Sequence, residues 1–336
     1  MEFCGGHTHV ISRYGLEDIL PDNIRMIHGP GCPVCVMPIG RIDSAIELAL
    51  DRKVILCTYG DTLRVPASNN LSLMKAKSLG GDIRMVYSPS DALTIAEENP
   101  DKEVVFFAIG FETTTPPTAV AAKTAREKNL KNFSIFCNHV LTPAAMRHIL
   151  NTPNGVQLEG FVGPAHVSTV IGSKPYEEFA NTYKKPVVIA GFEPLDMLQA
   201  VLMLVKQINE GRAEVENEFT RAVKPEGNLK AIRLCQEVFS LRDSFEWRGL
   251  GSVPNSALKM SEKYKDMDAE LKFNLEYRKV PDNKACECGA ILRGEKQPKD
   301  CRAFGTVCTP DHPIGSCMVS SEGACAAFYT YGRNRH

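Results

Sequence analysis

The sequence predicts an α/β protein in which two related parallel α/β/α domains precede a loop-rich, cysteine-rich C-terminal domain. Three observations predict this class. Short apolar runs alternate with amphipathic stretches from about residue 23 to 211, a Gly-Phe-Glu pattern occurs twice in that region, and six of the twelve cysteines lie within the last fifty-one residues. Alternation of strands and helices at this spacing is typical of parallel sheets covered by helices.

The expected strands are continuously apolar, as strands buried on both faces are. They are 23–29, 53–59, 82–88, 103–111, 133–140, 160–167 and 186–192. Amphipathic stretches predict helices between and after them, at 41–50, 69–81, 88–100, 116–129, 193–211 and 229–243. The residues from 212 to 228 are polar and are expected to form a connector.

An internal repeat favours two sheets over one. FAIGFETTTPPTAV (107–120) and VIAGFEPLDMLQAV (188–201) each read as strand, Gly-Phe-Glu, proline and helix. The expected domains are therefore 16–103, 104–215 and 216–336, with residues 1–15 packing near the domain junction.

Polar residues at the ends of these strands are candidates for a ligand site, because the carboxyl ends of parallel strands face the ligand crevice. They are Glu112, Glu193, Asn138, His139 and His166. The two glutamates also suit the first turn of a helix, where the dipole favours acids. The histidines equally suit capping or core positions, so the pattern leaves these roles open.

Charge and hydropathy exclude several classes of partner. Thirty-nine Lys and Arg residues stand against forty Asp and Glu residues, so the net charge of −1 gives no reason to expect nucleic acid or an anionic membrane. No apolar run reaches the roughly 18 residues of a membrane helix. MEFCGGHTHV lacks the features of a secretory signal, so a cytoplasmic protein is expected. In that reducing compartment, clustered cysteines more often bind metal or do redox chemistry than form structural disulfides.

The C-terminal cysteines predict a metal centre. From residue 281 onward Pro, Gly and Cys dominate, and such a segment needs a covalent or metallic link to become ordered. Zinc ribbons prefer two tight Cys-x(2–4)-Cys knuckles, which are missing here. The irregular spacing favours a cubane iron–sulfur cluster. Spacing alone does not choose its four ligands among Cys286, Cys288, Cys301, Cys308, Cys317 and Cys325.

The early cysteines suit either of two sites. Cys4 and His7 with Cys32 and Cys35 make a zinc set of the Cys-x-x-His plus Cys-x-x-Cys kind. The stiff GPGCPVC loop, however, follows a predicted strand and precedes a helix. A thiol near a helix N-terminus has its pKa lowered, which favours a redox dithiol. Cys4 then offers a soft thiolate to a low-valent metal, and His7 a nearby proton donor.

Three other cysteines are predicted to be inert small hydrophobic residues, because their surroundings are apolar. They are Cys57, Cys137 and Cys235.

Six motifs resemble, in the same order, those of the hydrogenase maturation factor HypD family. They are CGGHTH, GPGCPVCVMP, GFETTTPP, FCNHVLTPAA, GFVGPAHVS and IGSCMVSSEGACAA, and they run from residue 3 to about 331. Family members usually carry a helical stretch before the first motif, and this chain begins almost inside that motif. The resemblance implies two related α/β domains and a C-terminal domain that holds a 4Fe-4S cluster.

The resemblance also assigns the cysteines. The family spacing Cys-x14-Cys-x6-Cys-x16-Cys selects Cys286, Cys301, Cys308 and Cys325, which leaves Cys288 and Cys317 as spares. The essential early cysteine of the family corresponds to Cys4, and its redox pair to Cys32 and Cys35.

The function that the resemblance implies is a scaffold for assembly of the Fe(CN)2CO unit of NiFe-hydrogenases. The scaffold acts with a HypC-type chaperone and receives cyanide by way of a HypE-type donor. We expect the cluster to pass electrons to the Cys32–Cys35 pair, near an iron held partly by Cys4, while His7 and His9 orient or protonate the ligands. Glu322, near Cys325, is expected to be either a cluster-side acid or a capping residue.

Two other functions fit the same residues. One is a cluster-fed thiol-disulfide reductase resembling ferredoxin-thioredoxin reductase, in which Cys4 and His7 are dispensable. The other is a zinc-stabilised binding module. We expect a redox-active assembly scaffold rather than a turnover enzyme.

Overall fold

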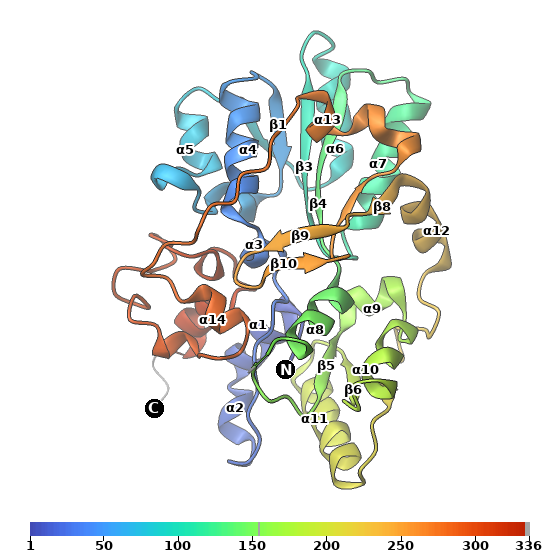
Figure 1. Ribbon diagram of the computed structural model, residues 1–336, viewed down its shortest axis with the longest axis vertical. Helices are drawn as coiled ribbons and strands as arrows, with labels where there is room; N and C mark the ends of the chain where they lie inside the picture. Colours follow the sequence, from blue (N-terminus) through green and yellow to red (C-terminus); the bar gives the residue numbers. More distant parts are fainter. Residues whose placement is uncertain (154, 333–336) are drawn as a thin grey trace.

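The computed structural model describes residues 1–153 and 155–332 and contains two parallel β-sheets (Figure 1). The first has the order β2-β1-β3-β4 and is built from β1 (Ile55–Thr58), β2 (Ile83–Met85), β3 (Val104–Gly110) and β4 (Phe133–His139). The second has the order β5-β6-β7 and is built from β5 (Phe161–Pro164), β6 (Val187–Ala190) and β7 (Val215–Asn217). All neighbouring strands in both sheets are parallel, which confirms the predicted α/β class.

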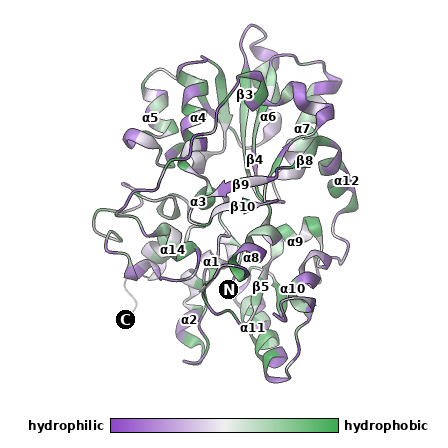
Figure 2. Ribbon diagram, viewed as in Figure 1, coloured by the Kyte–Doolittle hydropathy of each residue, from purple (hydrophilic) through white to green (hydrophobic). Residues whose placement is uncertain are grey.

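Helices cover these sheets. The helices next to strands of the first sheet in the sequence are α4 (Ile39–Leu50), α5 (Leu73–Ser78), α6 (Pro89–Glu98) and α7 (Thr115–Glu127). Those associated with the second sheet are α8 (Thr142–Leu150), α9 (Ala165–Ile171), α10 (Glu177–Asn181) and α11 (Pro194–Asn209). Alternate residues of β3 enter different core clusters, Phe107 in one and Phe106 in the other, so both faces of this strand are buried. Figure 2 shows the resulting hydrophobic colouring along β3 and β4.

The remaining elements are short and precede or follow the sheets. At the N-terminus they are α1 (Gly5–Tyr14), α2 (Leu16–Ile19) and α3 (Pro33–Val36). After the second sheet they are α12 (Leu229–Val238), β8 (Phe239–Leu241), β9 (Ser244–Trp247), β10 (Gly251–Pro254), β11 (Leu258–Met260), α13 (Ala269–Lys272), α14 (Cys288–Leu292) and α15 (Ala324–Ala327). Short 3-10 helices are η1 (Gly60–Arg64), η2 (Ser68–Asn70), η3 (Lys174–Tyr176), η4 (Glu262–Met267), η5 (Pro298–Asp300) and η6 (Ser316–Met318), and η7 (Phe328–Gly332) is a short π-helix. None of the helices in the described ranges is long and apolar enough to span a bilayer.

Four predicted elements differ from the observed ones. The strand expected at 23–29 is reduced to one isolated bridge, which joins His28 to Glu2 in the N-terminal segment. The strand expected at 160–167 ends at Pro164, so His166 lies in α9. The helix expected at 229–243 ends at Val238, where the chain turns into β8 to pair with β11. The expected connector contains β7, a half-buried edge strand whose polar sequence gave no strand signal.

The sheet pairing bears on the domain boundary expected at residue 104. β3 pairs with β1 and β4 pairs with β3, so the first sheet includes strands from both sides of residue 104, and the second sheet begins with β5. The two Gly-Phe-Glu segments do follow strands of different sheets, β3 and β6. Of the expected C-terminal segment 216–336, residues 333–336 lie outside the described part of the chain.

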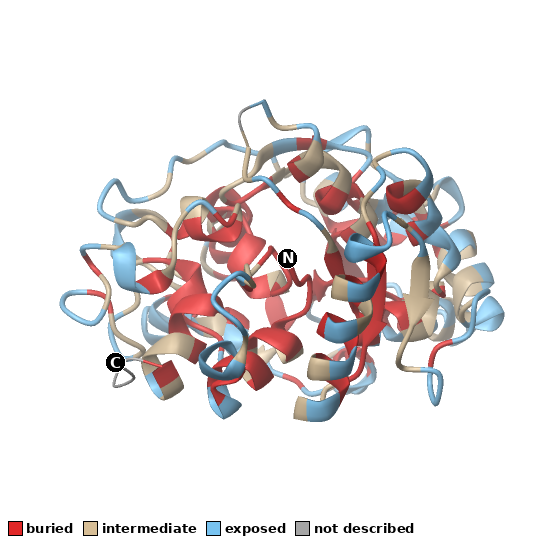
Figure 3. Cartoon of the chain, turned by 90° about the horizontal axis from the view of Figure 1, so that it is seen from below, coloured by how far each residue is buried: buried red, intermediate tan, exposed pale blue. Residues whose placement is uncertain are grey.

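The N-terminal segment connects the second sheet to the Cys-x-x-Cys loop. The amino group of Met1 donates to the carbonyl of Gly160 at 2.9 Å, and Glu2 forms parallel bridges with both Val162 and His28. Figure 3 shows this terminus among buried segments, and Phe3 is only 1% exposed. The residues around Cys4 therefore lie inside the protein, between elements that are far apart in sequence.

Candidate functional site

Cys4 lies directly against the Cys-x-x-Cys loop. Cys4 precedes α1, and the next residue, Gly5, donates its N–H to the carbonyl of Gly31 at 3.0 Å. A Cβ atom at Gly31 would lie 2.4 Å from the backbone nitrogen of Cys4, closer than any real contact. The two segments are therefore packed backbone to backbone, and only a glycine at position 31 permits the approach.

A buried carboxylate and a second acidic residue lie close to Cys4. Glu2 is fully buried and accepts hydrogen bonds from the Cys4 N–H at 2.8 Å, the Thr8 hydroxyl and Nδ1 of His28. Glu322 packs against Gly5, since a Cβ atom there would lie 2.3 Å from Cβ of Glu322. Burial raises the pKa of the Cys4 thiol to about 12, and the charges of Glu2 and Glu322 add to this effect. Cys4 is therefore a neutral thiol until a cation stabilises its thiolate.

His7 is fully buried and presents one free ring nitrogen. Its Nε2 donates to the carbonyl of Ala190 at the end of β6, at 3.0 Å. Burial lowers the pKa of His7, so the ring is neutral and Nδ1 carries a lone pair. Nδ1 has no hydrogen-bond partner within residues 1–153 and 155–332. This atom can accept a proton or bind a metal.

The other two candidate histidines of this region differ in their relation to His7. His166 packs against Phe192 in a tilted arrangement with ring centroids 4.1 Å apart, and the same phenylalanine contacts His7 at 5.2 Å. His9 instead packs edge-on against Tyr331 at 5.2 Å. Residues two positions apart point to opposite sides of a helix, so the structure does not bring His9 to the contacts of His7.

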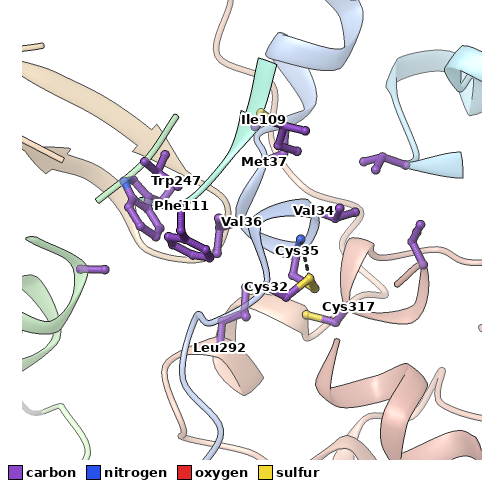
Figure 4. Packing of buried hydrophobic residues seen from close by; sticks show 14 of the residues in the cluster. Cys32, Val34, Cys35, Val36, Met37, Ile109, Phe111, Trp247, Leu292 and Cys317 are labelled. Atoms are coloured by element: carbon purple, nitrogen blue, oxygen red, sulfur yellow. Dashed lines mark hydrogen bonds between the residues drawn. A yellow bond between two sulfur atoms is a disulfide. The ribbon is translucent and has the colours of Figure 1, made fainter. Parts of the chain in front are cut away.

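Cys32 and Cys35 form a disulfide at the start of α3 (Figure 4). Their Cα atoms are 5.2 Å apart, Cys35 is fully buried, and the Cys35 N–H points at Sγ of Cys32 at 3.2 Å. The disulfide leaves these sulfurs without the thiolates that a zinc ion requires, which disfavours the zinc set for this pair.

A second disulfide joins Cys288 to Cys317, the two cysteines that the sequence left as spares. The segment carrying it touches the first disulfide: the Ser316 hydroxyl donates to the Cys35 carbonyl at 2.6 Å. A Cβ atom at Gly323 would lie 3.0 Å from Sγ of Cys35. Figure 4 shows the Cys317 side chain beside the Cys32–Cys35 disulfide. The sequence gave no sign of this pair, because its members are 29 positions apart within a segment that has no periodicity.

The four cysteines selected by the family spacing line one pocket. Cys286, Cys301, Cys308 and Cys325 surround it together with Cys288 and Cys317, and apolar side chains such as Phe304, Ile314 and Met318 complete the wall. Burial raises the pKa of Cys325 well above its usual value, and the charges of the other three thiols raise it further. Burial likewise raises the pKa of Cys286 to about 11. Four thiols held this closely in an apolar wall fit a centre whose positive charge converts them to thiolates.

A site for a single metal ion needs several ligands grouped around one point. Among the residues that the structure describes, no three His, Cys, Asp or Glu side chains are grouped so that they hold one metal ion. A cubane cluster differs from a single ion because its ligands bind at four separate corners.

The remaining candidates have structural roles. Glu112 is buried and accepts from the N–H and hydroxyl of Thr142, so it caps α8. Glu193 is the N-cap residue just before α11 rather than a first-turn acid, and its N–H donates to the Asp196 carboxylate at 3.2 Å. His139 is buried, with Nε2 2.9 Å from the Thr118 hydroxyl. Glu322 does not cap α15, whose N-cap is Gly323, and it lies beside Gly5 instead.

Cys57 and Cys137 are fully buried in β1 and β4, and Cys235 is half-buried in α12. All three lie in apolar core clusters, as expected for inert thiols.

The fold and the site together define an α/β protein that gathers cysteines from both ends of its chain around two adjacent buried disulfides. Comparison with known proteins gives the family: residues 1–332 match the family described as "HypD: Hydrogenase formation hypA family". The chain is 66% identical to the hydrogenase maturation factor HypD of Cupriavidus necator, covering 99% of this chain and 89% of that one. It is 66% identical to the Azotobacter vinelandii HypD, covering 100% and 89%, and 47% identical to the Escherichia coli HypD, covering 98% and 88%. The chain therefore belongs to the HypD family.

Proposed function

We propose that this chain is a scaffold on which the Fe(CN)2CO unit of NiFe-hydrogenase is assembled, in the cytoplasm, with a HypC-type chaperone and a HypE-type cyanide donor. The observation that carries the proposal is the convergence of Cys4, the Cys32–Cys35 disulfide and the Cys288–Cys317 disulfide. The names of the relatives, hydrogenase maturation factors, support the same assignment. The substrate is an iron ion that leaves carrying its diatomic ligands.

Residues after about 216 supply the redox part of the scaffold. Cys286, Cys301, Cys308 and Cys325 would hold a 4Fe-4S cluster, because they line one pocket and need a positive centre to become thiolates. When bound, such a cluster supplies electrons one at a time. The adjoining Cys288–Cys317 disulfide lines the same pocket and accepts a pair of electrons, which requires two successive one-electron transfers.

The two disulfides form a short relay in this proposal. Reduction of Cys288–Cys317 takes up two electrons and two protons and gives two thiols. One of these, as thiolate, attacks the Cys32–Cys35 disulfide, and a second exchange restores Cys288–Cys317 while Cys32 and Cys35 become thiols. The electrons thus reach the Cys-x-x-Cys loop, in which Gly31 packs against the backbone of Cys4. The Ser316 hydrogen bond to Cys35 keeps the donor and acceptor pairs adjacent.

Cys4 and His7 form the iron-binding corner. Cys4 is a neutral thiol that loses its proton when iron binds, and neutral His7 presents Nδ1 as a proton acceptor or ligand. Because Nε2 already donates to Ala190, a neutral His7 has no further proton to give. His9 packs against Tyr331 and holds α1 in place, so it is not part of this corner.

Maturation assays on cysteine variants test the proposal. A Cys4→Ala chain should fail to support hydrogenase maturation, and so should Cys32→Ser, whereas Cys235→Ser is the matched control with a half-buried thiol outside the site. The alternative function, a cluster-fed thiol-disulfide reductase, predicts that Cys4→Ala remains active while Cys32→Ser does not. Full maturation by Cys4→Ala would therefore overturn the scaffold assignment in favour of the reductase.

A further inference from the structure

Glu2 is held at both ends of its carboxylate. Oε2 accepts from the Cys4 N–H at 2.8 Å, while Oε1 accepts from the Thr8 hydroxyl and from Nδ1 of His28, the latter at 2.9 Å. Its side chain is 0% exposed and that of His28 is 14% exposed. Burying a carboxylate is costly unless it is paired and hydrogen-bonded, and here both conditions are met.

His28 is the counter-ion of Glu2 and also lies at the edge of a surface hollow. Burial alone lowers the pKa of His28, but the hydrogen bond and charge of Glu2 outweigh it and the pKa is raised. The hollow beside it is lined by Glu17, Arg25 and Lys296 among others. Glu2 and His28 are also joined through their backbones by an isolated parallel bridge. The pair thus fixes the segment that carries Cys4 against the segment that leads into the Cys-x-x-Cys loop.

We propose that Glu2 and His28 are positioning residues for the iron-binding reaction, in which Glu2 fixes the Cys4 backbone and His28 balances the charge of Glu2. This inference rests on the proposed function, since it takes Cys4 as the iron ligand. A hydrogen-bonded carboxylate behind a metal ligand sets both the orientation of the ligand and the electron density at the metal. Neither residue contacts iron in this arrangement.

The test uses full-length variants purified anaerobically with the HypC-type chaperone, with iron content and infrared spectra as readouts. Glu2→Ala should lower iron affinity about 10- to 100-fold, as loss of an outer hydrogen-bond partner commonly does. Glu2→Gln removes a negative charge, so the cyanide and carbonyl stretching bands should move to higher wavenumber. His28→Gln keeps a donor to Glu2 but removes the positive charge, so the bands should move to lower wavenumber. Glu127→Gln, at an exposed position of α7, is the control and should leave them in place.

Opposite shifts in the two glutamine variants support the proposal, because a residue that merely stabilises the fold has no reason to produce them. Unshifted bands in both variants would overturn it, including the case in which Glu2→Ala fails to fold. A Cys4→Ser chain separates failure of the proposed function from failure of this inference. If Cys4→Ser keeps its iron and its bands, the assignment of Cys4 and this inference both fail. If Cys4→Ser loses them while the Glu2 and His28 variants match wild type, only this inference fails.

Discussion

The contact between Gly31 and Cys4 can be tested by adding one methyl group. In a Gly31→Ala chain the new Cβ would lie 2.4 Å from the Cys4 nitrogen and 2.5 Å from the Phe3 carbonyl carbon, so backbone must move. Overpacking of this kind costs about 1–3 kcal/mol, and loss of the Gly5 N–H to Gly31 hydrogen bond adds about 1 kcal/mol. We therefore expect the free energy of unfolding to fall by about 2–4 kcal/mol.

Denaturant unfolding of the oxidised protein measures this loss, and anaerobic copurification measures the iron that the displaced Cys4 segment retains. Gly60→Ala is the matched control, because its added Cβ would meet only the end of the flexible Met85 side chain, at 3.0 Å from Sδ. We expect the control to stay within about 0.5 kcal/mol of wild type and to keep its iron. Equal stability and iron content of Gly31→Ala and Gly60→Ala would refute the reasoning, because the two segments would then not be in backbone contact.

Burial raises the pKa of Glu112 to about 7 from 4.5, so the folded state binds the extra proton and stability should fall by about 3 kcal/mol in all as pH rises through that window. Denaturant unfolding of Glu112→Gln between pH 4 and pH 8 should lack this component, and an unchanged profile would contradict it. Cys288→Ser should leave the Cys32–Cys35 disulfide oxidised when wild type is reduced by a one-electron donor, as thiol labelling and mass spectrometry would show; reduction at the wild-type rate would exclude the relay. Cys325→Ser should lose iron and acid-labile sulfide after anaerobic purification, and wild-type amounts of both would remove Cys325 from the cluster ligands.

The strands of the sheets were largely predictable because each is a short, continuously apolar run. β3 and β4 illustrate both the strength and the limit of such patterns. Their positions follow from their composition, but their membership of the first sheet depends on the pairing of β3 with β1 and of β4 with β3, which no local pattern encodes. β7 escaped prediction because a polar, half-buried edge strand has the composition of a loop.

The site divides in the same way. Cys4, His7 and the Cys32–Cys35 pair stand in short distinctive motifs, so their residue types and local spacing were sufficient to select them. The Cys288–Cys317 disulfide was missed, because only the folded chain brings its two halves together. The Glu2–His28 pair was missed for the same reason. The position of His9 was predictable in principle, since helical geometry alone places it on the opposite side of α1 from His7.

The infrared spectrum of the chain purified anaerobically with its chaperone, with iron determined on the same sample, decides whether iron is held at Cys4. We expect cyanide and carbonyl stretching bands in wild type and their disappearance in Cys4→Ser, with the iron of the four-cysteine pocket retained in both. A wild-type spectrum without such bands, or a Cys4→Ser spectrum that keeps them, would contradict the claim that this corner of the protein holds the iron while its ligands are attached.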